Sequence, residues 1–168
     1  REHFLKELSE ELNNIEFDIF GMNNVQPIWG NQFIKTISNY SMALNLSRGN
    51  PIKFYSSDRI AQLMGNGLLT FIDIRSQLNK IITNKEAVFY NNINDLKKKI
   101  YYFKNKSNQL RKIASNGRKA YHKKFKVKYN SHYTIKLQRL SCRICIAISY
   151  FVQILKWLRN SKHYLHCY

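Results

Sequence analysis

Acidic residues are missing from the second half of the chain. None of the ten follows Asp95, whereas nineteen of the twenty-eight Lys and Arg residues do. Residues 1–95 are close to neutral, with nine basic against ten acidic side chains, and residues 96–168 carry a formal charge of +19. This asymmetry points to an anionic partner for the second half, such as nucleic acid, an anionic membrane surface or a phosphorylated substrate. A lysine-rich face that only meets solvent is the competing interpretation.

Cysteine is also scarce. Cys142, Cys145 and Cys167 are too few and too clustered for a disulfide framework, which favours a reducing, cytoplasmic compartment. The spacing Cys-x-x-Cys, with His163 and His166 downstream, raises zinc as an alternative. Structural zinc sites place such ligands on turns and knuckles, whereas here an apolar, helix-like run lies between them. We therefore expect ordinary cysteines and no bound metal.

No apolar run is long enough to span a bilayer. The longest, residues 144–158, has fifteen residues and is interrupted by Gln153 and Lys156, whereas a spanning helix needs roughly 20. We expect residues 129–168 to form a basic, apolar helical tail, with an interfacial helix or one that packs on a domain outside this sequence.

Before the tail, patterns typical of helices and strands alternate. Helical spacing predicts helices over residues 1–14, 33–40 and 58–66, a helix-like patch at 74–82, and two helices that begin at the cap Asn94 and at Ser107. Apolar runs predict strands over residues 15–20, 42–46, 68–72 and 87–90. This alternation predicts an α/β, Rossmann-like domain over residues 1–128, with a parallel sheet and helices on both faces.

The stretch 42–72 has the order of a phosphate-binding unit. A strand ends in a polar loop, Ser56 and Ser57 offer N-caps to a helix, and a second strand follows. In open parallel sheets, phosphates bind at the carboxyl ends of strands and at helix N-termini.

Three stretches resemble the donor-binding C-terminal domain of GT-B glycosyltransferases, in the group 1 and spore-maturation-protein-like branch. They are residues 58–70 (DRIAQLMGNGLLT), the pair Asp95-Leu96 after VFYNN, and residues 110–118 (LRKIASNGR). The resemblance covers residues 1 to about 128 and implies the C-terminal half of a GT-B fold, whose first strand would lie upstream of Arg1. Because the chain begins without methionine, we expect a fragment. It would lack the N-terminal acceptor domain with the catalytic base, and would be inactive alone.

The resemblance implies transfer of a sugar from a nucleotide-sugar to a glycan, lipid or protein acceptor. The nucleotide-sugar would be a substrate and not a cofactor, and the reaction would need no metal ion. Basic side chains and a helix dipole would stabilise the diphosphate leaving group. Gln62 lies where the family usually has a glutamate that bonds to the ribose. The expected donor-binding residues are Ser47, Arg48, Ser56, Ser57, Asp58, Arg59 and Gln62.

Two alternatives stay open. Residues 55–60 (YSSDRI) also resemble the Tyr-x-Thr-Glu-Lys donor motif of α1,3-fucosyltransferases, which would make the donor a GDP-sugar. The rival class is a non-catalytic basic α/β module that binds nucleic acid or an anionic membrane surface. In Lys97–Lys128, aromatic residues interleave with lysine as in a single-strand groove, but their helical spacing directs them to the sheet. We therefore prefer a membrane to nucleic acid, and a cytoplasmic protein peripheral at the inner face of the membrane.

Overall fold

The computed structural model describes residues 2–12, 14–21, 24–47, 49–124 and 143–147. The helices are α1 (Glu2–Glu11), α2 (Gly30–Ile37), α3 (Asp58–Gly65), α4 (Ile93–Lys104) and α5 (Ser107–Lys124), with two single 3₁₀ turns, η1 (Ile74–Ser76) and η2 (Leu78–Lys80). The strands are β1 (Glu16–Phe20), β2 (Met42–Asn45), β3 (Leu69–Asp73), β4 (Val88–Tyr90) and β5 (Arg143–Ala147).

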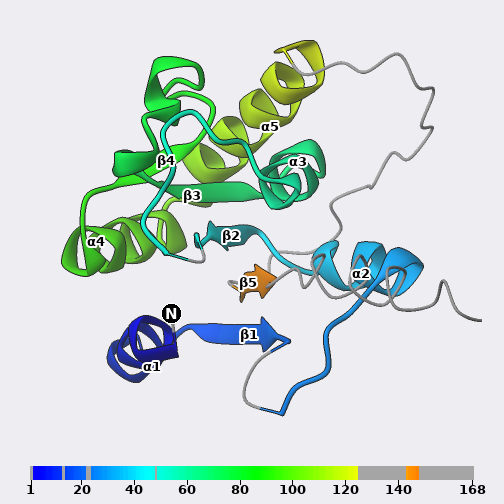
Figure 1. The fold of residues 1–168 in the computed structure, drawn as a ribbon, viewed down its shortest axis with the longest axis vertical. Coiled ribbons are helices and arrows are strands. Elements are labelled where there is room, and N and C mark those ends of the chain that lie inside the picture. Colours follow the sequence, from blue (N-terminus) through cyan, green and yellow to red (C-terminus); the bar gives the residue numbers. More distant parts are fainter. Residues whose placement is uncertain (1, 13, 22–23, 48, 125–142, 148–168) are drawn as a thin grey trace, which may run out of the picture.

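These strands form one five-stranded sheet in the order β1-β5-β2-β3-β4, with every neighbouring pair parallel. Strands β2, β3 and β4 are buried along their whole length. Burial on both faces is typical of parallel sheets covered by helices, and it explains why these strands are short apolar runs without polar alternation. The predicted α/β, Rossmann-like class is confirmed (Figure 1).

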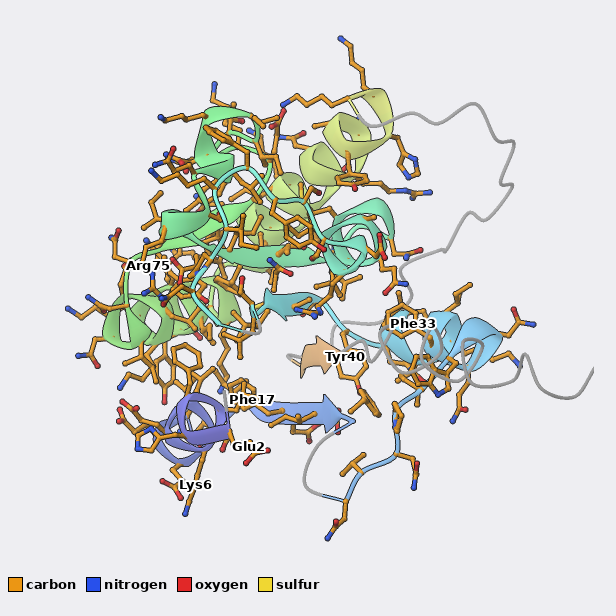
Figure 2. The ribbon with its side chains drawn as sticks, in the orientation of Figure 1. Glu2, Lys6, Phe17, Phe33, Tyr40 and Arg75 are labelled. Carbon is orange, nitrogen blue, oxygen red and sulfur yellow. The ribbon has the colours of Figure 1, made fainter. Side chains whose placement is uncertain are left out.

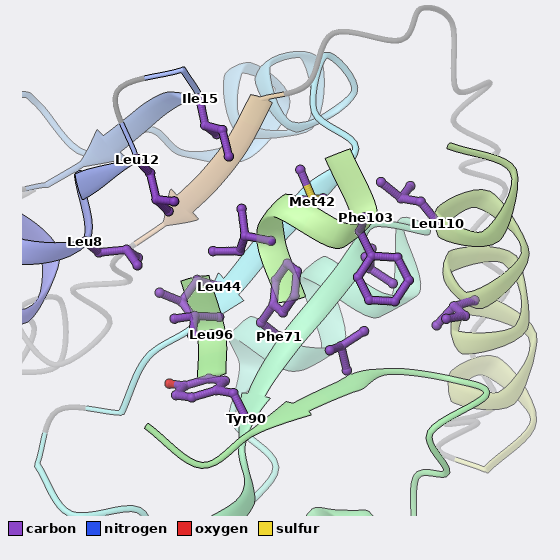
Figure 3. Packing of buried hydrophobic residues seen from close by; sticks show 14 of the residues in the cluster. Leu8, Leu12, Ile15, Met42, Leu44, Phe71, Tyr90, Leu96, Phe103 and Leu110 are labelled. Carbon is purple, nitrogen blue, oxygen red and sulfur yellow. The ribbon is translucent and has the colours of Figure 1, made fainter. Parts of the chain in front are cut away.

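Helices cover both faces of the sheet. On one face, α1 and α4 pack on β2 and β3, where Leu12, Leu96 and Phe103 surround Leu44 and Phe71 (Figure 3). On the other face, α2 and α3 pack on the same strands through a second set of apolar side chains. The Tyr40 hydroxyl, just before β2, donates a 2.7 Å hydrogen bond to Asp18 of β1 (Figure 2).

Helix α5 lies across the amino ends of β3 and β4. Its Gly117 packs directly on the carbonyl of Glu86, just before β4, and on Met64 of α3. At its last turn, His122 contacts the Gly65 carbonyl at 3.0 Å and Lys124 pairs with Glu86 at 2.8 Å. The amino ends of these strands are therefore covered, and their carboxyl ends are left to the loops.

The C-terminal prediction is wrong for residues 144–147. They were expected in a helix, but they belong to β5, between β1 and β2. An apolar run of this length fits a buried parallel strand as well as a helix, and periodicity alone does not separate the two. The rest of the expected helix lies outside the described residues. The domain division at residue 128 and the strand upstream of Arg1 stay predictions.

Two local predictions also need correction. The patch at 74–82 is not one helix, because Gln77 adopts a left-handed conformation (φ 54°) between η1 and η2. The cap of α4 is Asn92 and not Asn94, since the Asn92 side chain accepts a 2.9 Å hydrogen bond from the Asp95 backbone N–H. Asp95 in return accepts from the Asn91 backbone N–H at 3.0 Å, which resembles a capping box.

We expect Gly117→Ala to destabilise the fold. A Cβ at this position would lie far inside the contact distance of the Glu86 carbonyl oxygen. Overpacking of this kind costs about 1–3 kcal/mol, against a gain of about 1 kcal/mol from the better helix propensity of alanine. Urea unfolding should show a net loss for Gly117→Ala and little change for Ser115→Ala, an exposed position on the same helix. Equal stability of the two variants would contradict the close approach.

Candidate functional site

The candidate site lies at the carboxyl ends of β2 and β3, beneath the loop of residues 46–57. After Asn45 this loop crosses the sheet and enters α3 (Figure 1). Its far part is held by a 2.8 Å hydrogen bond from the Phe54 N–H to the Ser76 carbonyl, just beyond β3. The start of α3 is thereby fixed against the ends of both strands.

Phe54 marks the point where this loop is held. Its φ of 60° is left-handed, a conformation that bulky side chains rarely adopt and that costs about 1–3 kcal/mol. The ring is half-exposed, with the Lys80 ammonium 5.7 Å from its centroid. The hydrogen bond to Ser76 and the short connection to α3 therefore impose a backbone conformation that the residue itself disfavours.

Ser57 is the N-cap residue of α3, as predicted, but neither predicted serine caps the helix with its side chain. Ser57 occupies the N-cap position of α3 in an extended conformation, but its side chain accepts no hydrogen bond from the helix. Its hydroxyl instead donates to the Asn45 side chain at 3.3 Å. The Ser56 hydroxyl oxygen is buried and has no hydrogen-bond partner within the described part of the chain. Both hydroxyls thus lie at the positive end of α3 without serving as its caps.

Arg59 is buried, with 8% of its surface exposed, although it lies in the first turn of a helix. Its Nη1 donates a 2.5 Å hydrogen bond to the Leu46 carbonyl, which immediately follows β2. The guanidinium therefore ties α3 to the end of β2 and holds a positive charge beside the loop. Its burial shows that Arg59 is not merely a solvated surface arginine.

The other predicted residues lie around Arg59 at different depths. Ser47 is half-buried directly after Leu46, Asp58 is exposed in the first turn of α3, and Gln62 is half-buried one turn further on. Arg48 lies outside the described residues. The structure thus brings Ser56, Ser57 and Arg59 to the end of β2, with Gln62 on the following turn.

The sequence prediction missed a second polar group, at the ends of β3 and β4. Buried Asp73 accepts hydrogen bonds from the Arg75 backbone N–H (2.9 Å), Nε (3.1 Å) and Nη2 (2.7 Å). These bonds raise the pKa of Arg75, whose side chain points outward (Figure 2). In the sequence, the position of Asp73 directly after an apolar run was the signal that could have predicted this polar group.

Tyr90 lies opposite Asp73 in the pairing of β3 with β4. It is 2% exposed, and its hydroxyl has no hydrogen-bond partner among the residues described (Figure 3). Burial, followed by the nearby charge of Asp73, raises the pKa of Tyr90 well above its usual range. The hydroxyl is therefore a neutral donor near neutral pH.

A separate hollow of about 420 Å³ lies at the outer edge of β4, between α4 and α5. Phe89, Lys99 and Tyr102 line it, and none of the predicted donor residues does. Lys99 donates to the Phe89 carbonyl at 2.7 Å and pairs with Asp95 at 2.8 Å. Lys99 belongs to α4, and its bond to the Phe89 carbonyl covers the free edge of β4, so this hollow is part of a protected sheet edge.

Within the described ranges, no three His, Cys, Asp or Glu side chains are grouped as metal ligands would be. Cys142, His163, His166 and Cys167 lie outside those ranges, and for Cys145, in β5, only the backbone is described. No described helix combines the length and the apolar character needed to cross a membrane.

An open parallel sheet, with a polar loop and a helix N-terminus at the carboxyl ends of its strands, defines a Rossmann-like α/β domain. A family model described as glycosyl transferase-like matches residues 1–135, which is most of the chain. The chain belongs to this family and is a glycosyltransferase domain. No curated protein and no solved structure matches it.

We expect Arg59→Ala to lower the free energy of unfolding by about 2 kcal/mol. The substitution removes a hydrogen bond from a charged donor and leaves the Leu46 carbonyl without it, and such bonds contribute about 1.5–3 kcal/mol. Urea unfolding measures the loss, with Arg111→Ala, an exposed arginine of α5, as the matched control. The contact would be unimportant if both variants unfolded at the same midpoint.

Proposed function

We propose that this chain is the donor-binding half of a metal-independent, GT-B-type glycosyltransferase of the group 1 and spore-maturation-protein-like branch. The diphosphate of a nucleotide-sugar binds at the start of α3. The observation that carries this proposal is the pair of serine hydroxyls, Ser56 and Ser57, which lie at that helix end without capping it. Phosphate oxygens accept hydrogen bonds from such hydroxyls and from the first N–H groups of a helix.

The charge of Arg59 supports the same ligand. It lies in the first turn of α3, where the helix dipole also favours an anion. As the glycosidic bond breaks, negative charge grows on the departing diphosphate, so a cation held in place stabilises the transition state more than the ground state. Ser47, on the loop after β2, adds a donor to the same phosphates, and Arg48, which the sequence predicts to do the same, lies outside the described residues.

Gln62 and Asp58 contact the sugars of the donor. The Gln62 amide both donates and accepts hydrogen bonds, and it meets the ribose hydroxyls from the second turn of α3. Asp58, exposed in the first turn, meets hydroxyls of the transferred sugar. The acceptor and the catalytic base belong to a second domain, so this chain binds the donor and does not complete the transfer alone.

The double substitution Ser56→Ala with Ser57→Ala tests the phosphate site. Calorimetric titration with UDP, GDP and their sugars should show one nucleotide class bound, and the double variant should bind it at least about 10-fold more weakly, since each bond to a charged group contributes about 1.5–3 kcal/mol. The double variant should also lose about 0.5–1.5 kcal/mol of stability, because Ser57 no longer donates to Asn45, and it should remain folded. Ser115→Ala is the control. Unchanged affinity in the double variant would overturn the site, and a preference for GDP would support the fucosyltransferase-like alternative.

Gln62→Glu should strengthen nucleotide binding, whereas the serine substitutions should weaken it. A carboxylate accepts stronger hydrogen bonds from ribose hydroxyls than an amide does, so the variant should bind the same nucleotide about 5- to 10-fold more tightly. Gln109→Glu, at an exposed position of α5, is the matched control. Equal or weaker binding by Gln62→Glu would show that position 62 does not face the ribose.

A further inference from the structure

Helix α5 has 18 residues and contains no acidic side chain. Its inward face consists of apolar or small residues, namely Leu110, Ile113, Ala114 and Gly117. The opposite face presents four exposed cations, Arg111, Lys112, Lys119 and Lys123, which we call the basic ridge.

None of the four ridge side chains forms an ion pair with a described residue. Lys124, at the end of the same helix, differs because it pairs with Glu86 and bonds to the Ile81 carbonyl. Lys119 lies seven residues after Lys112 and four before Lys123, and like charges at such spacings on one helix face repel one another. The ridge therefore carries a cost in the isolated chain that an anionic surface would relieve.

Helix α5 packs on the end of α3 that lies opposite the proposed donor site. α5 covers the amino ends of β3 and β4, where it contacts Glu86 and Gly65, whereas Ser56, Ser57 and Arg59 lie at the carboxyl end of β2. In Figure 1 the loop after β2 crosses in front of the sheet to enter α3, and α5 packs on α3 at Met64 and Gly65, the last residues of that helix. The ridge is thus no extension of the diphosphate site, and it can engage a second anion while the donor is bound.

We propose that the basic ridge docks this domain on a membrane surface that contains anionic lipids. A straight helix of 18 residues is roughly 27 Å long, so its outward cations form a row that can meet a flat surface together. Each Lys or Arg near such a surface contributes about 1 kcal/mol, and anionic lipids are concentrated in the cytoplasmic leaflet. The outward face of α5 has no exposed apolar side chain, so attachment is electrostatic and peripheral.

Single-stranded nucleic acid fits this face less well. It binds to basic grooves in which aromatic rings stack on the bases. The aromatic residue of α5, Tyr121, packs inward on the core beside α3, and Phe103 of α4 is buried. Tyr101 and Tyr102 are exposed, contrary to the expectation that the aromatics face the sheet, but they belong to α4 and not to the ridge.

Vesicle flotation tests the proposal. The purified chain should float with phosphatidylcholine vesicles that contain phosphatidylglycerol, should lose this binding at high salt, and should not float with pure phosphatidylcholine. The variant Arg111→Glu, Lys112→Glu, Lys119→Glu should bind anionic vesicles at least about 100-fold more weakly, because three favourable charges are reversed. The control variant Lys6→Glu, Lys35→Glu, Lys53→Glu has the same net charge at exposed positions elsewhere and should retain most of the binding.

Equal losses in the two triple variants would overturn the proposal, because binding would then follow net charge and not the ridge. Flotation with neutral vesicles would also overturn it, as would retention on single-stranded or duplex nucleic acid without vesicle binding. Nucleotide titration of the ridge variant keeps the two proposals distinguishable. The ridge variant should bind the nucleotide with unchanged affinity. A negative vesicle result therefore does not affect the donor-site proposal, and a negative nucleotide result does not affect the membrane proposal.

Discussion

The parallel pairing of β2 with β3, buried on both faces, is the constraint on which the rest of the structure depends. It brings the carboxyl ends of both strands to one edge, so the loop after β2 and the turn after β3 must meet there. The hydrogen bond between Phe54 and Ser76 joins these two segments. With α5 across the amino ends of β3 and β4, the carboxyl edge is where the chain can present polar side chains to a ligand.

The sequence allowed most of this architecture to be predicted, because its periodicities and the buried faces agree. Leu5, Leu8 and Leu12 lie at helical spacing and are all buried, and the apolar run at 42–46 is the buried strand β2. The predictions failed where a local pattern fitted two structures. Ile144 and its neighbours suit a helix or a central strand, and only the sheet order, which pairs them with β1 and β2, decides between them.

The location of the candidate site could be predicted from the sequence, but its hydrogen bonds could not. Spacing places Ser56 and Ser57 before a helix, where serine usually caps. The Ser57 hydroxyl instead donates to the Asn45 side chain, twelve residues earlier, and no local pattern reveals this partner. Asp73 and Tyr90 were missed for the same reason: they become neighbours only through the register of β3 with β4. Contacts between the ends of adjacent strands depend on tertiary structure.

Arg59 shows how stability and ligand binding are connected at this edge. Burying a guanidinium is costly, and the bond to the Leu46 carbonyl offsets part of that cost. An anion bound at the start of α3 would add a favourable charge interaction with this buried cation. A ligand that binds only the folded chain stabilises it by an amount that grows with its concentration over Kd. The cation that ties α3 to β2 is therefore also the group through which diphosphate binding would strengthen the contact between them.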